Sequence, residues 1–287
     1  MRIAVFDDYR IGVIREQGVH DVTEVLPGWT PEFAPILVNR FIAQFSELRS
    51  AVEEIASSAP ARPIELVTLR PPVPRPAHIF AAPLNFRAHQ EEMRTLIGSG
   101  DPTADKLGFF LKATGSLSGP AQAVELPYLP GRRFDHEGEV AFVIGKEARA
   151  VSRARALEHV FGYTILVDVT MRMTHTEREE RVLRKSFSTF APLGPCIVTA
   201  DEVTDPAALR IRLWRNGELK QDARLRDLIV DVPGLIERAS SVLPLQPGDV
   251  FATGSPAGVG EIQPGDEVLV EVAEIGRMRL PVKRREW

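Results

Sequence analysis

The chain has 287 residues, 44% hydrophobic and 26% charged, a composition typical of a folded globular protein and not of a disordered one. Its formal net charge of -4 excludes the overall positive field that non-specific nucleic-acid binding requires, and its single cysteine excludes an internal disulfide and a cysteine-rich metal site. No apolar run reaches the roughly 18 residues of a membrane span, and the acidic start does not resemble a signal peptide, so we expect a cytoplasmic protein without membrane or nucleic-acid partners.

The beginning of the chain predicts a small α/β module. Residues 2–6 are expected to form a strand, and residues 22–26 a second short strand that ends at a Pro-Gly turn. Apolar side chains in residues 38–56 recur at helical spacing. A proline-rich stretch follows, and its stiffness and missing amide donors suit a linker. We therefore predict an N-terminal module at 1–72 and a second domain at 73–287.

The second domain is predicted to be rich in strands. Glycine and proline cluster as turns between short apolar runs, a pattern that favours many strands over long helices. One helix is expected from Pro233 onward, since proline is tolerated in a first helical turn. The clearest strands are expected at residues 140–144, 163–169, 211–214, 250–253 and 268–272. The predicted fold class is therefore mixed and β-rich, of the α+β type.

Two glutamates stand just before the predicted strand at 140–144 and are expected to share one face of the extended chain. Because alternate strand residues point the same way, Glu137 and Glu139 lie together, roughly 7 Å apart along the backbone. Two carboxylates on the inward face of an apolar strand repel each other, and a hard divalent cation would relieve that repulsion. The alternative is two solvated glutamates at an exposed strand end, where charged residues usually lie.

A third acid, Asp168, stands in the apolar run of residues 162–170. An aspartate in a buried strand needs a partner, because an unpaired buried charge is expensive. It would either pair with an arginine, Arg172 being the nearest, or act as a third carboxylate ligand. Three carboxylates make an all-oxygen site, which suits Mg²⁺ or Mn²⁺ better than Zn²⁺.

A series of short motifs resembles the fumarylacetoacetate hydrolase family over roughly residues 76–285. No single motif is decisive, and the resemblance rests on their order. In chain order they are Glu137-x-Glu139, Asp168-Val169-Thr170, Lys185-Ser186-Phe187, Pro192-Leu193-Gly194-Pro195, Asn216-Gly217-Glu218 with Gln221, Pro247-Gly248-Asp249 and the loop Thr253 to Gly260. The first seventy residues match only the looser N-terminal module that many members carry.

The resemblance implies a fold and a metal centre. Family members have a β-roll or sandwich-like catalytic domain, usually in a homodimer. They hold a divalent cation with an E-x-E pair and a later aspartate, positions that match Glu137, Glu139 and Asp168 here. The implied cofactor is Mg²⁺ or Mn²⁺, and the trio is the one that the residues themselves suggested.

The resemblance also implies a catalytic His–Glu pair on a short lid helix, matched by the phrase Asn85-Phe86-Arg87-Ala88-His89-Gln90-Glu91-Glu92. His89 and Glu92 are spaced i, i+3 and share a helical face. A carboxylate beside an imidazole orients it and raises its basicity, as a general base acting on water requires. Without the resemblance, a surface helix with a solvated histidine is the preferred interpretation.

Further residues are implied on the substrate side. Lys185 matches the family's lysine, which implies stabilisation of enolate charge. Lys112 matches a second, substrate-binding lysine, and Ser255 keeps the hydroxyl of the usual threonine. Arg172 completes the expected substrate-binding set. The alternative for both lysines is a solvated surface amine, and for the Ser255 loop a plain turn.

Other positions bear on the choice of substrate. The arginine-rich runs at 132–133 and 178–185 would suit an anionic substrate, although charge runs are usually solvated faces. The chain departs from the family pattern at four positions that we expect near the substrate pocket, namely Ala113, Met173, Ser188 and Leu225.

The implied function is a metal-dependent hydrolase that cleaves a carbon–carbon bond in an acylpyruvate-like or other diketo acid through a metal-bound enolate, as in aromatic-compound catabolism. Glu92 would orient His89, which would take a proton from water. A decarboxylase, isomerase or hydratase acting on a similar 2-oxo acid would use the same centre. A non-catalytic dimer that binds a metal or ligand is a third alternative, since a fold alone does not fix a function.

Overall fold

A computed structural model of the chain describes residues 1–97, 103–174, 176 and 179–286. The helices are α1 (Ala34–Ser58), α2 (Arg87–Ile97), α3 (Ala104–Leu107), α4 (Arg181–Arg184) and α5 (Val232–Val242). The strands are β1 (Arg2–Phe6), β2 (Arg10–Arg15), β3 (Gly18–Asp21), β4 (Ala61–Arg62), β5 (Leu69–Arg70), β6 (Ile79–Ala81), β7 (Phe110–Lys112), β8 (Leu117–Ser118), β9 (Val124–Leu126), β10 (Phe134–His136), β11 (Gly138–Ile144), β12 (Val160–Val167), β13 (Thr170–Met171), β14 (Ala191–Thr199), β15 (Arg210–Arg215), β16 (Glu218–Arg224), β17 (Val250–Ala252), β18 (Gly260–Glu261), β19 (Glu267–Val272) and β20 (Gly276–Arg284). None of the helices within these described ranges has the length and apolar character that crossing a membrane demands.

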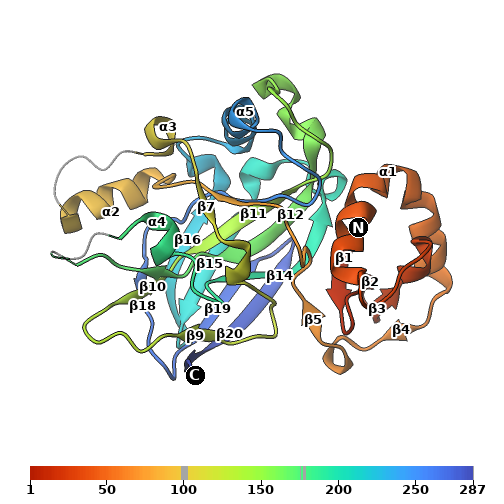
Figure 1. Cartoon of the computed structure of the whole chain (residues 1–287), viewed down its shortest axis with the longest axis horizontal. Coiled ribbons are helices and arrows are strands. Elements are labelled where there is room, and N and C mark those ends of the chain that lie inside the picture. The colour runs from red at the N-terminus through yellow and green to blue at the C-terminus, as the bar shows by residue number, and fades with distance from the viewer. Residues whose placement is uncertain (98–102, 175, 177–178, 287) are drawn as a thin grey trace.

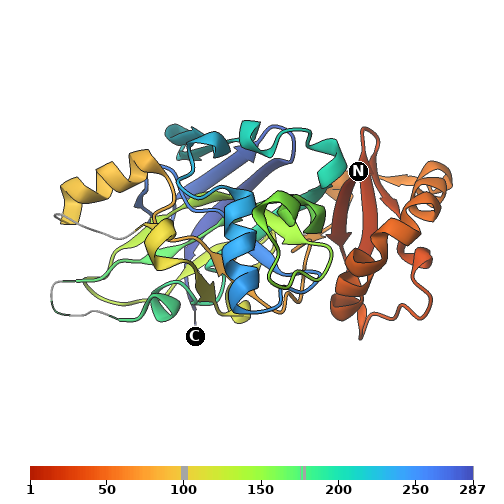
Figure 2. The same cartoon turned by 90° about the horizontal axis from the view of Figure 1, so that it is seen from above.

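One large mixed sheet runs through the molecule in the order β4-β3-β2-β1-β14-β12-β11-β17-β6-β7, with β5 paired to β1 and β8 paired to β14. The N-terminal strands join this sheet because β1 pairs antiparallel with β14, with Arg2 opposite Val198. The N-terminal segment, red to orange in Figures 1 and 2, lies at one end of the molecule, and α2 lies at the other. The β-rich mixed fold predicted from the sequence is confirmed, and the boundary after residue 72 stays a prediction.

The N-terminal segment follows the sequence prediction except at one strand. The strand expected at 2–6 is β1, and the helix expected at 38–56 lies within α1. The strand expected at 22–26 is wrong, because Thr23–Val25 forms a short 3-10 helix. The cause is the side chain of Asp21, which accepts hydrogen bonds from the Thr23 N–H at 3.0 Å and the Thr23 hydroxyl at 2.6 Å. Such a side-chain bond competes with strand pairing and turns the chain.

A second sheet packs against the central strands of the first. Its order is β16-β15-β19-β20-β9, and residues of β15, β19 and β20 contact β11, β12 and β14. The core between the two sheets holds Phe142, Tyr163, Leu213 and Val270, all at most 1% exposed. Burying such side chains contributes about 1.5–3 kcal/mol each, so this sandwich holds β11 and β12 rigidly beneath the site.

We predict that Gly162 is essential to the packing of β12 against β14. A Cβ atom at this position would lie 2.2 Å from the Val198 carbonyl oxygen, which is sheet backbone and cannot rotate away. Gly162→Ala should therefore lower the free energy of unfolding by about 1–3 kcal/mol, the range for an overpacked core. The midpoint of urea unfolding measures the change.

The matched control is Gly115→Ala, because a Cβ there meets nothing within 4 Å. This control should change the unfolding free energy by less than about 0.5 kcal/mol. Equal midpoints for the Gly162 variant and the unmodified protein would contradict the prediction, because β12 and β14 would then accommodate the extra Cβ atom without cost.

Candidate metal centre and active site

Three carboxylates meet where β11 pairs with β12. The two strands run antiparallel with Gly138 opposite Val167. The flanking residues Glu137 and Asp168 therefore also face each other, and the Asp168 N–H donates to the Glu137 carbonyl at 2.8 Å. Glu139 lies two residues along the same face. Carboxylate oxygens of Glu137, Glu139 and Asp168 lie within 4.8 Å of one another, and these residues are 5%, 2% and 1% exposed.

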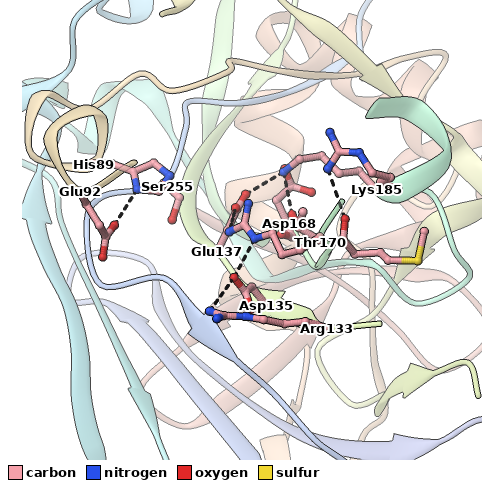
Figure 3. A network of polar contacts seen from close by, with 12 residues as sticks. His89, Glu92, Arg133, Asp135, Glu137, Asp168, Thr170, Lys185 and Ser255 are labelled. Carbon is pink, nitrogen blue, oxygen red and sulfur yellow. Dashed lines mark hydrogen bonds and ion pairs between the residues drawn. The ribbon is translucent and has the colours of Figure 1, made fainter. Parts of the chain in front are cut away.

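Two buried lysines compensate part of this negative charge. The Lys185 ammonium donates to Glu137 Oε2 at 2.7 Å and to the Thr170 hydroxyl at 2.8 Å, and it also contacts Asp168 (Figure 3). Lys112 donates to the other Asp168 oxygen at 2.5 Å. Asp168 is thus paired with lysines, and the alternative that it pairs with Arg172 is wrong. Lys112 is fully buried against this metal-ligand candidate, and its predicted contact with substrate stays a prediction.

Arg172 instead links Glu137 to a fourth acid, Asp135. Its Nε donates to Asp135 and its Nη2 donates to Glu137, each at 2.7 Å. Arg133 donates to Asp135 at 2.6 Å (Figure 3). Burial lowers the pKa of Arg172, but the two carboxylates outweigh burial and raise this pKa above its ordinary value. Sequence reasoning missed Asp135, although its spacing of two from Glu137 placed it on the same face.

The charge balance differs between the two glutamates. Burial raises the pKa of Glu137, but Lys185 and Arg172 outweigh burial and hold this pKa below its usual range. Burial and the nearby Asp168 raise the pKa of Glu139 well above its usual range. The Glu139 carboxylate accepts a hydrogen bond from the Gly254 N–H at 2.6 Å, and among the described residues no cationic side chain forms an ion pair with it. One buried carboxylate of the cluster therefore lacks a positive partner.

A divalent cation fits this cluster. Glu137, Glu139 and Asp168 would hold it through an all-oxygen ligand set, which hard cations such as Mg²⁺ and Mn²⁺ prefer. The cation would supply the positive charge that Glu139 lacks, and it would remove the mutual repulsion that raises the pKa of that carboxyl group.

The loop that follows β17 contacts the carboxylate cluster, because its Gly254 N–H donates to Glu139. Ser255 accepts a hydrogen bond from Gln221 Nε2 at 2.7 Å, and Gln221 Oε1 accepts one from the Gly138 N–H at 2.9 Å. Gly254 has a φ of +101°, and a Cβ there would lie 2.7 Å from the Cβ of Asn85. Glycine is therefore required for the loop to bring its N–H to Glu139.

The candidate acid–base pair lies on α2. Asn85, just before this helix, is fully buried, and its side chain bonds the backbone of Val230 and Thr253 at 2.8 Å, which fixes the start of the helix. His89 Nδ1 bonds Glu92 Oε2 at 2.8 Å, as Figure 3 shows, and Glu92 Oε1 accepts from the Gly258 N–H at 3.0 Å. Burial raises the pKa of Glu92, but these two hydrogen bonds bring it below its ordinary value.

One cavity of about 430 Å³ brings these groups together. Of the residues predicted for the site, its lining includes His89, Glu137, Glu139, Asp168, Arg172, Lys185 and Ser255. Met173, one of the expected departures, also lines it, whereas Glu92 and Lys112 support lining residues from behind. Sequence reasoning did not select the remaining lining residues, among them Leu84, Met93, Phe110, Arg133, Asp135, Arg181, Arg184 and Val259. The signals available were the charge runs for the arginines, the spacing of two from Glu137 for Asp135, and the motif Thr253 to Gly260 for Val259.

Comparisons with known proteins relate the chain to one family. The family model described as fumarylacetoacetate (FAA) hydrolase C-terminal matches residues 78–283. A maleylpyruvate hydrolase of Aquipseudomonas alcaligenes is 40% identical over 295 residues, with 99% of each chain covered. The crystal structure of maleylpyruvate hydrolase from Sphingobium sp. SYK-6, in complex with manganese (II) ion and pyruvate, is 40% identical, with a TM-score of 0.87 and both chains fully covered.

A more distant structure extends the range of activities. A probable 2-hydroxyhepta-2,4-diene-1,7-dioate isomerase from Mycobacterium abscessus is 28% identical, with a TM-score of 0.80 over 100% of this chain and 99% of the other. The match of the family model over most of the chain, together with relatives 40% identical over its whole length, places this protein: the chain belongs to the fumarylacetoacetate hydrolase family.

Proposed function

We propose that this protein is a divalent-metal-dependent hydrolase that cleaves a carbon–carbon bond in an acylpyruvate-type diketo acid. The observation that carries the proposal is one cavity lined by a buried three-carboxylate cluster and by a histidine that a glutamate orients. Family membership and the 40% identical maleylpyruvate hydrolases support an enzyme of this class over a binding-only protein. Manganese in one relative supports a divalent cation, and Mg²⁺ suits the same ligands.

Glu137, Glu139 and Asp168 would hold the cation. When bound, it acts as a Lewis acid toward the 2-oxo acid end of the substrate, a contribution of several kcal/mol in typical metal sites. Arg172 and Lys185 keep Glu137 ionised, because both donate hydrogen bonds to its carboxylate. The protein thus keeps this one ligand charged in a buried site.

His89 serves as the general base. Glu92 accepts a hydrogen bond from Nδ1, so the lone pair of His89 lies on Nε2, where it takes a proton from water. The resulting hydroxide attacks the distal carbonyl carbon. The bond from that carbon to the neighbouring methylene then breaks, and its electron pair passes to the pyruvate fragment as an enolate that Lys185 stabilises. Return of the proton gives pyruvate and a carboxylic acid, with one water consumed.

An isomerase, hydratase or decarboxylase of the same family would share the carboxylate cluster, and the similarity to a probable isomerase keeps that alternative in view. The His89–Glu92 pair favours hydrolysis, because hydrolysis needs an activated water and decarboxylation does not. The cytoplasmic location and the homodimer stay predictions.

Replacing Glu139 by glutamine tests the metal centre. Adding Mn²⁺ to the unmodified protein should raise its melting temperature, because a ligand that binds only the folded state stabilises it. Glu139→Gln should remove most of that shift. Without metal the variant should melt at the same or a higher temperature than the unmodified protein, since the buried carboxylate lacks a cationic partner.

Glu47→Gln on the exposed face of α1 is the matched control and should keep the full Mn²⁺ response. A Glu139 variant that binds Mn²⁺ as tightly as the unmodified protein, measured by isothermal titration calorimetry, would refute the assignment of this ligand.

Replacing His89 by alanine tests the hydrolytic role. The variant should lose about 10²–10⁴-fold in kcat on acylpyruvates, the usual contribution of a general base, while Mn²⁺ binding persists. Loss of the enol absorbance of the substrate measures the rate. Arg87→Ala, exposed on the same helix, controls for changes in helix stability. Full activity of the His89 variant would exclude this histidine as the base.

A further inference from the structure

A buried glutamine of the second sheet reaches the active site and has no place in the mechanism above. Gln221 lies on β16, the edge strand of its sheet. The other residues of this strand are half-buried or exposed, whereas Gln221 is only 1% exposed. Burying an amide is costly unless its polar atoms are paired, so the partners of Gln221 indicate what this side chain does.

A β-bulge turns Gln221 toward the interior. Leu213 of β15 pairs with Gln221, and the next residue of β15 pairs with Leu219. Lys220 is therefore an extra residue in the edge strand. Bulges redirect side chains and are frequent beside active sites. The loop after β17 packs directly against this bulge, because a Cβ atom at Gly258 would lie 1.8 Å from the Lys220 carbonyl oxygen.

The Gln221 amide links this loop to the strand segment that bears the carboxylates. Its Oε1 accepts a hydrogen bond from the Gly138 N–H at 2.9 Å, between the two glutamates of the cluster. Its Nε2 donates to the Ser255 hydroxyl at 2.7 Å and to the Pro256 carbonyl at 2.8 Å. A backbone N–H only donates and a carbonyl only accepts, so these partners permit a single orientation of the amide.

The bond from Gln221 determines how the Ser255 hydroxyl can be used. A hydroxyl has one proton to donate and two lone pairs, and Gln221 Nε2 occupies one lone pair. Among the described residues, the Ser255 proton finds only distant acceptors, the carbonyls of Gly138 at 3.3 Å and of Pro256 at 3.5 Å. Good bonds between oxygen atoms measure about 2.7–2.8 Å. Because Ser255 lines the cavity, its proton is available to a better acceptor there, above all an anionic oxygen.

We infer that Gln221 is a positioning residue whose amide holds Ser255 as a hydrogen-bond donor toward the 2-oxo acid end of the substrate. Gln221 acts through Ser255 and supports it from behind the cavity wall. The inference rests on the proposed function, in which a 2-oxo acid occupies this cavity. It assigns to the second sheet a part in substrate binding as well as in the packing of the core.

The test uses pyruvate as the probe, because pyruvate consists of the 2-oxo acid end alone. Isothermal titration calorimetry of the Mn²⁺-loaded protein compares Gln221→Met, Ser255→Ala and the double variant. Ser255→Ala should weaken pyruvate binding about tenfold or more, as loss of a hydrogen bond to a charged group does, and Gln221→Met about 3- to 10-fold. The double variant should bind pyruvate at most about twofold more weakly than Ser255→Ala alone, because Gln221 acts only through Ser255.

A merely structural role of Gln221 would give a different pattern. The Mn²⁺ affinity of Gln221→Met should stay within about threefold of the parent value, since strand register places the carboxylates. The matched control is Gln122→Met, because Gln122 Oε1 also accepts a backbone N–H, from Gly119 at 2.7 Å, but this glutamine is exposed. The control should leave both affinities unchanged. Losses that multiply in the double variant, or full pyruvate affinity in Gln221→Met, would overturn the inference.

A crystal structure of the unmodified Mn²⁺-loaded protein with pyruvate tests the same point without a variant, which matters if Gln221→Met does not fold. Ser255 Oγ should lie within about 3 Å of a pyruvate oxygen while Gln221 Nε2 stays bonded to it. A Ser255 hydroxyl that bonds the Gly138 carbonyl and not pyruvate, or a parent protein that does not bind pyruvate, would overturn the inference. Neither measurement requires turnover, so pyruvate binding of this kind without cleavage of any acylpyruvate would refute the proposed hydrolysis alone.

Discussion

The structure depends on the neutralisation of buried negative charge at the junction of β11 and β12. Glu137, Glu139 and Asp168 are removed from water by a sheet whose two faces are covered, and unpaired carboxylates in such surroundings are strongly destabilising. Lysines and an arginine neutralise two of the three acids, while the single hydrogen bond to the Glu139 carboxylate from the residues that the structure describes comes from the backbone N–H of Gly254. A divalent cation held by the three carboxylates, as proposed, would compensate the charge of Glu139.

The carboxylate cluster and the candidate base are held by different parts of the fold. The carboxylate cluster is built by strand register, which the packing of two sheets fixes on both sides. The candidate base instead lies on α2, which is held at its beginning by Asn85 and further along by the bond from Gly258 to Glu92. The carboxylate cluster thus lies on paired strands, and the candidate base lies on a helix held by side-chain hydrogen bonds at Asn85 and Glu92.

The polar groups around the cluster form a connected network in which each member has more than one task. Arg172 holds Glu137 ionised and also anchors Asp135, and Lys185 contacts both Glu137 and Asp168. Within such a network the effect of one substitution spreads to its neighbours, because removing one partner leaves another charge buried and unpaired.

The sequence by itself determined the strand-rich fold. It gave rise to the metal trio and the His89–Glu92 pair as hypotheses. Strand period two placed Glu137 and Glu139 on one face, helical spacing placed His89 beside Glu92, and motif order indicated the family. The strand predicted at 22–26 failed because a local side-chain bond from Asp21 competes with strand pairing. Only the tertiary structure decided that Asp168 pairs with Lys112 and Lys185 and that Arg172 binds Asp135. These contacts join segments far apart in the chain, and their formation depends on strand register and loop closure, which no local pattern of residues encodes.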